Sequence, residues 1–124
     1  MIVDSGKSDL AANYIKTHYR RIKVGVGSDD TTSGSVDLDS PVVNSSGVVL
    51  ATDNIVPSHE NSRLAWTISF TGSQLGTQGI SELGIFKQTS DATNDTMLSR
   101  VTFTNTGVIA ASDTITFVIE MEVN

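Results

Sequence analysis

Two long stretches in the second half of the chain alternate between apolar and polar or small residues. In residues 64–71 the apolar positions are Leu64, Trp66, Ile68 and Phe70. In residues 115–123 they are Ile115, Phe117, Ile119, Met121 and Val123. A side-chain period of two is the period of a β-strand that places one face on a core and the other in water. The chain is therefore expected to build antiparallel sheets around an apolar core.

Turn-forming residues separate these stretches from several further strand candidates. We expect strands over residues 22–26, 48–56, 63–71, 79–87, 96–104 and 113–123. The Gly, Asn, Asp and Ser clusters between them recur roughly every 8–15 residues, which is typical of small all-β domains. The pattern predicts a mainly β fold, namely an antiparallel β-sandwich of the jelly-roll or Ig-like kind with a short N-terminal helix.

The N-terminal third differs in character from the rest of the chain. Residues 5–19 have helical spacing, with Ser5 or Ser8 as the expected cap. Residues 28–47 are rich in Ser, Thr and Asp and predict a polar loop or arm. Neither segment is firmly anchored by its own sequence, so both are candidates for docking on a neighbouring subunit.

The length of the chain and the alternating residues also predict its organisation. A chain of 124 residues is most simply one domain, so we expect a single β-sandwich over residues 1–124, with residues 1–20 as its N-terminal helical segment. The predicted core residues are Trp66, Ile68, Phe70, Phe86, Phe103 and Phe117.

The charge balance excludes some partners. The formal net charge is -6, and an acidic surface repels phosphate backbones, so nucleic acid is not an expected partner. Lys16, Arg20, Arg21 and Lys23 form a basic cluster, for which an anion-binding patch and a solvated turn both remain open. No apolar run approaches the about 20 residues of a membrane-spanning helix, so no membrane span is expected.

Residues with catalytic or metal-binding chemistry form no recognised pattern. The acidic pairs that offer oxygen ligands to Ca²⁺ are Asp29-Asp30 and Asp37-x-Asp39, and neither has the spacing of a helix-loop-helix calcium site. His59 and Glu60 have no second histidine at ligand spacing. The G-x-S-x-G turn of serine hydrolases does not occur. We therefore expect no catalytic residue, no metal site and no cofactor.

Glu82 is the most informative single carboxylate. If residues 80–86 form a strand, Glu82 shares a face with Ile80, Gly84 and Phe86. A carboxylate in such surroundings needs a partner, and Arg100 on the following predicted strand is the natural candidate. We expect a structural pair that fixes strand register. A catalytic role for Glu82 is the alternative, although no second reactive group accompanies it.

Three successive segments of the chain carry motifs that also occur, in the same order, in a known group of proteins. Residues 80–86 read I-S-E-L-G-I-F, residues 98–103 read L-S-R-V-T-F, and residues 114–117 read T-I-T-F. They resemble the I-[ST]-E-[IL]-G-[LI]-F, L-x-R-x-x-F and [ST]-[IL]-x-[IFV] strands of small structural proteins of tailed viruses of bacteria and archaea. An upstream [IV]-x-[VI]-G-x-G strand of that group is similar to residues 22–27. Residues 88–95 depart from the pattern, because a tight turn is common there.

The resemblance implies a non-enzymatic virion component that assembles as a homo-oligomer with other virion structural proteins at the tail tip, baseplate or fibre attachment. Alternatives are a capsid-surface decoration or turret protein, and a module that binds a host receptor or glycan through loops 28–47 and 88–95. A hydrolase of the cell envelope is the alternative from another class. It would need two convergent acids, or a nucleophile with its base.

Overall fold

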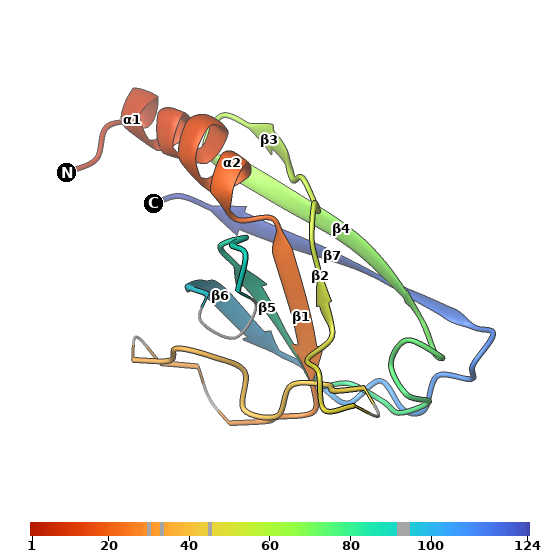
Figure 1. Cartoon of the computed structure of the whole chain (residues 1–124). Coiled ribbons are helices and arrows are strands. Elements are labelled where there is room, and N and C mark those ends of the chain that lie inside the picture. Colours follow the sequence, from red (N-terminus) through yellow and green to blue (C-terminus); the bar gives the residue numbers. More distant parts are fainter. Residues whose placement is uncertain (30, 33, 45, 92–94) are drawn as a thin grey trace.

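A computed structural model describes residues 1–29, 31–32, 34–44, 46–91 and 95–124 of the chain. It confirms the mainly β fold, because it contains two antiparallel sheets, of four and three strands, and one short N-terminal helical segment, an arrangement consistent with a β-sandwich (Figure 1). The elements are α1 (Asp4–Asp9), the π-helical η1 (Leu10–Ile15), α2 (Lys16–His18), β1 (Arg21–Gly25), β2 (Ala51–Thr52), β3 (Ser58–Glu60), β4 (Arg63–Thr71), β5 (Glu82–Phe86), β6 (Met97–Thr102) and β7 (Thr114–Glu122).

The two sheets differ in how they are built. The four-stranded sheet has the order β2-β1-β5-β6, and the three-stranded sheet has the order β3-β4-β7. The longest ladder joins β4 to β7 and runs without a break from the pair Arg63–Glu122 to the pair Thr71–Thr114. This ladder is formed by the two alternating stretches of the sequence, which therefore lie side by side although they are far apart along the chain.

The apolar core lies between the sheets and extends beneath the helix. Trp66, Ile68 and Phe70 of β4 are buried in it, together with Ile22 and Val24 of β1. Phe103 and Phe117 lie at its margin, where they are partly buried and their ring centroids are 5.6 Å apart. The strand period thus directs the β4 apolar face inward, as the sequence predicts, while the β7 face is only half covered.

The N-terminal helical segment packs on its own chain. Ala11, Ile15 and Tyr19 belong to the core cluster, and the Trp66 Nε1–H donates a hydrogen bond to the Tyr19 carbonyl oxygen at 2.9 Å. The expected serine cap is wrong, because Val3 occupies the cap position and no side-chain cap hydrogen bond forms there. Tertiary packing rather than capping therefore holds the segment in place.

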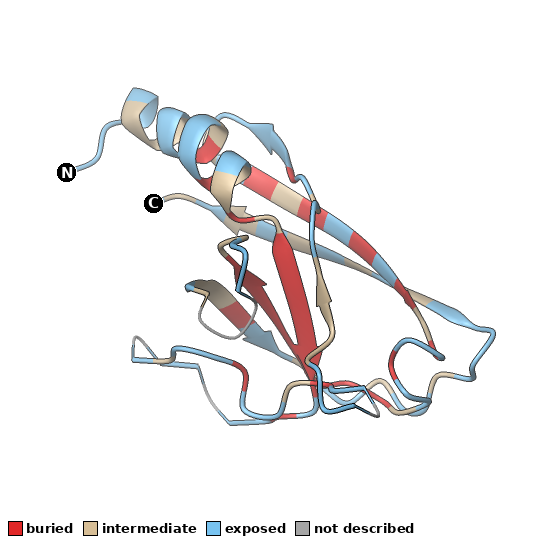
Figure 2. Ribbon diagram, in the orientation of Figure 1, coloured by how far each residue is buried: buried red, intermediate tan, exposed pale blue. Residues whose placement is uncertain are grey.

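The two central strands of the four-stranded sheet, β1 and β5, are covered on both faces. Every residue of β1 and β5 is buried, whereas β7 alternates between exposed and intermediate positions (Figure 2). One face of the sheet carries Ile22, Val24, Leu83 and Ile85 into the core, and the opposite face carries Arg21, Lys23, Glu82 and Phe86. Loop segments cover this second face, so a third layer lies outside the sandwich.

Phe86 belongs to this second face. It is fully buried but lies outside the main core cluster, and the Lys23 ammonium sits 4.2 Å from its ring centroid. A Cβ added at Gly84 would lie 2.6 Å from the Phe86 ring and 3.0 Å from a Leu38 methyl carbon, so Phe86 and Leu38 pack over that glycine. The aromatic ring therefore helps to hold the loop layer rather than the sandwich core.

One expected strand is shorter in the structure, and one observed strand was not expected from the sequence. The strand expected over 48–56 is reduced to β2 and an isolated bridge between Val43 and Val49. Asn54, with a φ of 62°, leaves the extended conformation shortly after β2. Sequence reasoning also missed β3, whose residues Ser58–Glu60 are all exposed and give no alternating signal. No helix within the described residues is both long and apolar enough to cross a membrane.

Candidate functional site

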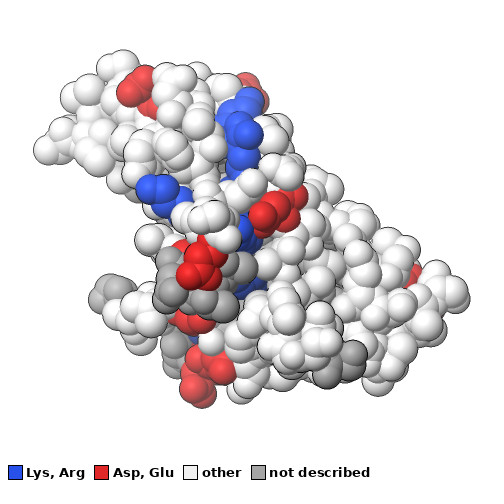
Figure 3. All heavy atoms as spheres, in the orientation of Figure 1, with Lys and Arg blue, Asp and Glu red and all other residues white. Residues whose placement is uncertain are grey.

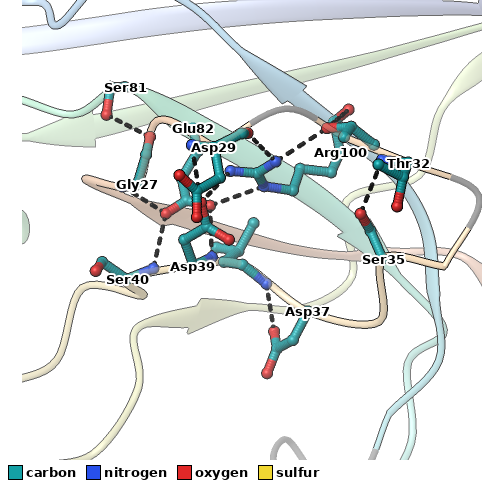
Figure 4. Close-up of polar contacts among 12 residues, drawn as sticks. Gly27, Asp29, Thr32, Ser35, Asp37, Asp39, Ser40, Ser81, Glu82 and Arg100 are labelled. Atoms are coloured by element: carbon teal, nitrogen blue, oxygen red, sulfur yellow. Dashed lines mark hydrogen bonds and ion pairs between the residues drawn. The ribbon is translucent and has the colours of Figure 1, made fainter.

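Glu82 is the first residue of β5, and its carboxylate lies on the second face of the four-stranded sheet, at the end where β1 and β6 finish. Glu82 is 0% exposed, and its two oxygens accept four hydrogen bonds (Figure 4). Oε2 accepts from the backbone N–H of Gly27 at 2.6 Å and of Ser40 at 2.9 Å. Oε1 accepts from the backbone N–H of Asp39 at 2.9 Å and from Arg100 Nε at 3.0 Å. Four donors replace the hydration that this charge loses on burial.

Arg100 of β6 is the charge partner of Glu82 and makes contacts of its own. The structure brings the two predicted residues together, since the glutamate on β5 is next to the arginine on the neighbouring strand. Arg100 Nη2 pairs with the Asp39 carboxylate at 3.0 Å, and Nη1 donates to the Asp29 carbonyl at 2.7 Å and to the Thr31 hydroxyl at 3.0 Å. The planar guanidinium therefore binds three groups of the loop layer with its fixed fork of donors.

These contacts show how the described part of residues 28–47, predicted as a polar loop or arm, is attached to its own chain. The described part of this segment folds back over its own four-stranded sheet, where Asp29, Thr31, Asp39 and Ser40 bind the Glu82–Arg100 pair. The sequence predicts a polar loop or arm here, because Ser, Thr and Asp are typical of loops. In this segment the same residues supply donors and acceptors to a buried ion pair.

Two glycines allow the loop layer to approach the sheet closely. A Cβ at Gly25 would overlap the Ser40 carbonyl oxygen, and a Cβ at Gly27 would overlap both the Asp39 side chain and the Glu82 carboxylate. The G-x-G of the first strand thus marks the place where another part of the backbone crosses it. A phosphate-binding function is not needed to explain these glycines.

A second cluster of charges lies on the same face of the sheet. Arg21 Nε and Nη2 bind the two Asp53 oxygens at 2.7 Å and 3.1 Å, and Arg21 Nη1 binds Asp95 at 3.1 Å. Lys23 Nζ binds the other Asp95 oxygen at 2.9 Å. Asp95 stands at the end of the insertion expected over 88–95, of which residues 92–94 lie outside the described residues. The insertion is therefore tied to β1 by buried ion pairs.

The four basic residues that the sequence groups together do not all lie in this second cluster. Arg21 and Lys23 are buried in ion pairs, so neither an anion-binding patch nor a solvated turn describes them. Lys16 lies elsewhere, with its Nζ 3.3 Å from His59 Nδ1, and Arg20 Nε donates to the Lys16 carbonyl. On the face shown in Figure 3, Lys and Arg atoms lie beside Asp and Glu atoms rather than forming one large positive area.

The surroundings shift the pKa of two of these groups. Burial alone would raise the pKa of Glu82. The hydrogen bond from Ser40, the pair with Arg100 and the hydrogen bonds from Asp39 and Gly27 lower the pKa by more than burial raises it, so the net pKa lies below the ordinary 4.5. The hydrogen bond to Asp53 raises the pKa of Arg21 against the effect of burial, and Asp95 adds to the rise. Glu82 and Arg21 are therefore both charged at neutral pH.

The other residues considered for chemistry remain apart. Within the described part of the chain, no group of three or more His, Asp or Glu side chains could hold a metal ion. Asp39 is engaged by Arg100 and by the Asp29 N–H, while Asp30 lies outside the described residues. His59 and Glu60 line an open hollow of about 530 Å³ together with Arg63 and Glu122. The lining of this hollow therefore carries charges of both signs.

The arrangement around Glu82 is suited to holding structure rather than to turnover. Both oxygens of Glu82 and all three guanidinium nitrogens of Arg100 have internal partners, and no buried side-chain nitrogen or oxygen in the described residues lacks one. Sequence reasoning found the Glu82–Arg100 pair but missed Asp39, Gly27 and the cluster around Asp95. The close spacing of Gly25 and Gly27 was the signal in the sequence for the approach of Asp39 to the sheet.

Comparison of the chain with protein-family models, with curated proteins and with solved structures gave no match.

Removing the Glu82 charge should destabilise the fold strongly. We expect Glu82→Gln to lower the free energy of unfolding by about 3 kcal/mol, because the buried Arg100 loses a partner and three backbone N–H groups lose an anionic acceptor. Glu122→Gln is the matched control, since its 3.8 Å pair with Arg63 is exposed and contributes below about 1 kcal/mol. Urea unfolding followed by Trp66 fluorescence measures both. Equal losses in the two variants would contradict a central role for Glu82.

The pH dependence should report the same group. Because the pKa of Glu82 is lower in the folded than in the unfolded chain, its charge stabilises the fold above pH 4.5, and this contribution is lost as the pH falls through the folded-state value. The stability gap between the unmodified protein and Glu82→Gln should therefore be constant near neutral pH and should narrow in acid. The gap is obtained from urea unfolding across this range. A gap that does not change with pH would show that Glu82 keeps an ordinary pKa.

Proposed function

We propose that this protein is a non-enzymatic structural component of a tailed virus particle of bacteria or archaea, and that it acts as a homo-oligomer at the tail tip, baseplate or fibre attachment. The proposal starts from the resemblance of residues 80–86 and 98–103 to strands of such virion proteins. The observation that carries it further is the position of the two charged motif residues. Glu82 and Arg100 are the buried pair that fixes the loop layer on the sheet.

A motif whose charged residues bind only internal groups specifies architecture. Gly27 also has a defined structural role, because the Asp39 side chain of the loop layer lies where a Cβ on Gly27 would be. A resemblance in such residues supports a shared fold and a shared mode of assembly, whereas an enzymatic resemblance would be expected in reactive side chains at a surface. This supports a structural role over an envelope hydrolase that uses Glu82, because Glu82 has no exposed surface from which to reach a substrate.

Capsid-surface decoration remains the closest alternative within the same class, and the anchored loop layer fits either location. A receptor- or glycan-binding module would use loops 28–47 and 88–95, whose described polar residues include several that bind the sheet beneath them. These internal contacts favour the scaffold role over the binding module.

The test is to locate the protein on virus particles. Particles from the source culture, purified by density gradient, should contain the chain at several copies each, as measured by quantitative mass spectrometry. Immunogold labelling should place it at the end of the tail. Labelling spread over the capsid would select the decoration alternative, and particles that lack the chain would contradict the proposal altogether.

A further inference from the structure

Strand β7 forms one edge of the three-stranded sheet and is unusually open. It runs from Thr114 to Glu122 with an unbroken register against β4, and it contains neither Gly nor Pro. Its other edge pairs with no strand in the described part of the chain. Natural edge strands are normally short, bulged or interrupted by proline or charge, because a long open edge invites pairing with another chain.

The side chains of β7 add apolar surface to this open edge. The residues that face the core are only partly buried, among them Phe117, Ile119 and Met121. On the outer face Val118, at the middle of the strand, is 61% exposed. The strand therefore offers both unpaired backbone groups and half-covered apolar side chains along its length. Figure 2 shows β7 coloured as intermediate and exposed, with no buried residue.

The hydrogen bonds at the two ends of β7 show which backbone groups point away from β4. The Val123 N–H donates to the Ser62 carbonyl at 2.9 Å, and the Asp113 carbonyl accepts from the Gly72 N–H at 2.9 Å. Backbone direction alternates along a strand, so the odd-numbered residues point toward β4. The even-numbered residues from Thr114 to Glu122 point their N–H and C=O groups to the open edge.

We propose that a second copy of this chain pairs antiparallel with β7 across a two-fold axis at Val118. In this register Val118 faces Val118 of the second copy, Thr116 faces Glu120, and Thr114 faces Glu122. The outward-pointing backbone groups then meet in hydrogen-bonded pairs. On the inner face Phe117 meets Ile119 of the other copy, so half-covered apolar side chains are brought together. The two three-stranded sheets become one continuous sheet.

The charges of β7 select this alignment over the others. Both carboxylates, Glu120 and Glu122, lie at the C-terminal end of the strand, and the N-terminal end carries Thr114 and Thr116. A parallel in-register pair would place each glutamate opposite itself, and an antiparallel pair centred at Glu120 would do the same for that residue. The alignment centred at Val118 overlaps the whole strand and leaves no carboxylate opposite another, which avoids like-charge repulsion.

This inference rests on the assembly part of the proposed function and adds to it the interface and its symmetry. It concerns purified protein in solution, so its failure and the absence of the chain from virus particles are separate results. Light scattering of the unmodified protein at high micromolar concentration should give twice the 13.2 kDa of one chain. A monomer, or an oligomer of another size, would overturn the two-fold proposal.

Charge substitutions at the axis provide the sharper test. Val118→Lys and Val118→Glu should each halve the mass, because like charges then face one another, and an equimolar mixture of the two should restore the dimer. Val108→Lys is the matched control, since Val108 is 75% exposed outside the strand, and it should leave the dimer intact. Trp66 fluorescence checks that each variant is folded. Variants at Val118 that remain dimeric alone, or stay monomeric when mixed, would overturn the proposal.

Cross-linking gives an independent measurement of the same contact. The chain contains no cysteine, so Val118→Cys introduces a unique thiol. A short bismaleimide should join two copies of Val118→Cys, whose Cα atoms would be about 5.5 Å apart. Val108→Cys should remain uncoupled under the same conditions. Equal coupling of the two variants, or coupling at Val108 alone, would overturn the pairing through β7.

Discussion

The burial of one carboxylate governs the outer layer of this protein. Glu82 has no exposed surface, and an unpaired charge in that position would be incompatible with a stable fold. Its four donors come from Arg100 and from the backbone near Gly27, Asp39 and Ser40. These groups lie on three segments that are distant along the chain. The requirement to satisfy one anion therefore fixes where the polar loop must lie on the sheet.

The two faces of the four-stranded sheet are therefore buried in different surroundings. One face contributes aliphatic side chains to the sandwich core, and the other holds ion pairs beneath loops. A buried ion pair is weak support for stability as such, because an apolar replacement can be equally stable. We interpret the pairs here as devices of specificity, since they select one position for segments whose sequences have little apolar content. The sheet that remains unprotected is the other one, at β7.

Much of the fold could be predicted from the alternation in the sequence, and parts of it could not. The residues of β4 and β7 have a period of two because their opposite faces meet different surroundings. In β1 and β5 both faces are buried. The charged residues Arg21 and Lys23 alternate with apolar residues in β1, a pattern that predicts a solvent-exposed face, so their burial could not be predicted from it. The Glu82–Arg100 pair was accessible from strand order alone. Its loop partners, such as Asp39, depend on a chain path that local patterns do not encode.

Amide hydrogen exchange tests the central role of the Glu82 carboxylate most directly. Asp39 and Ser40 lie in an exposed loop outside the regular strands, and their N–H groups donate to Glu82. If that carboxylate holds the loop layer, these two amides and that of Gly27 should exchange as slowly as the amides of the β4–β7 ladder. Exchange at the rate of an unprotected loop would contradict a fixed loop layer and the role assigned to Glu82.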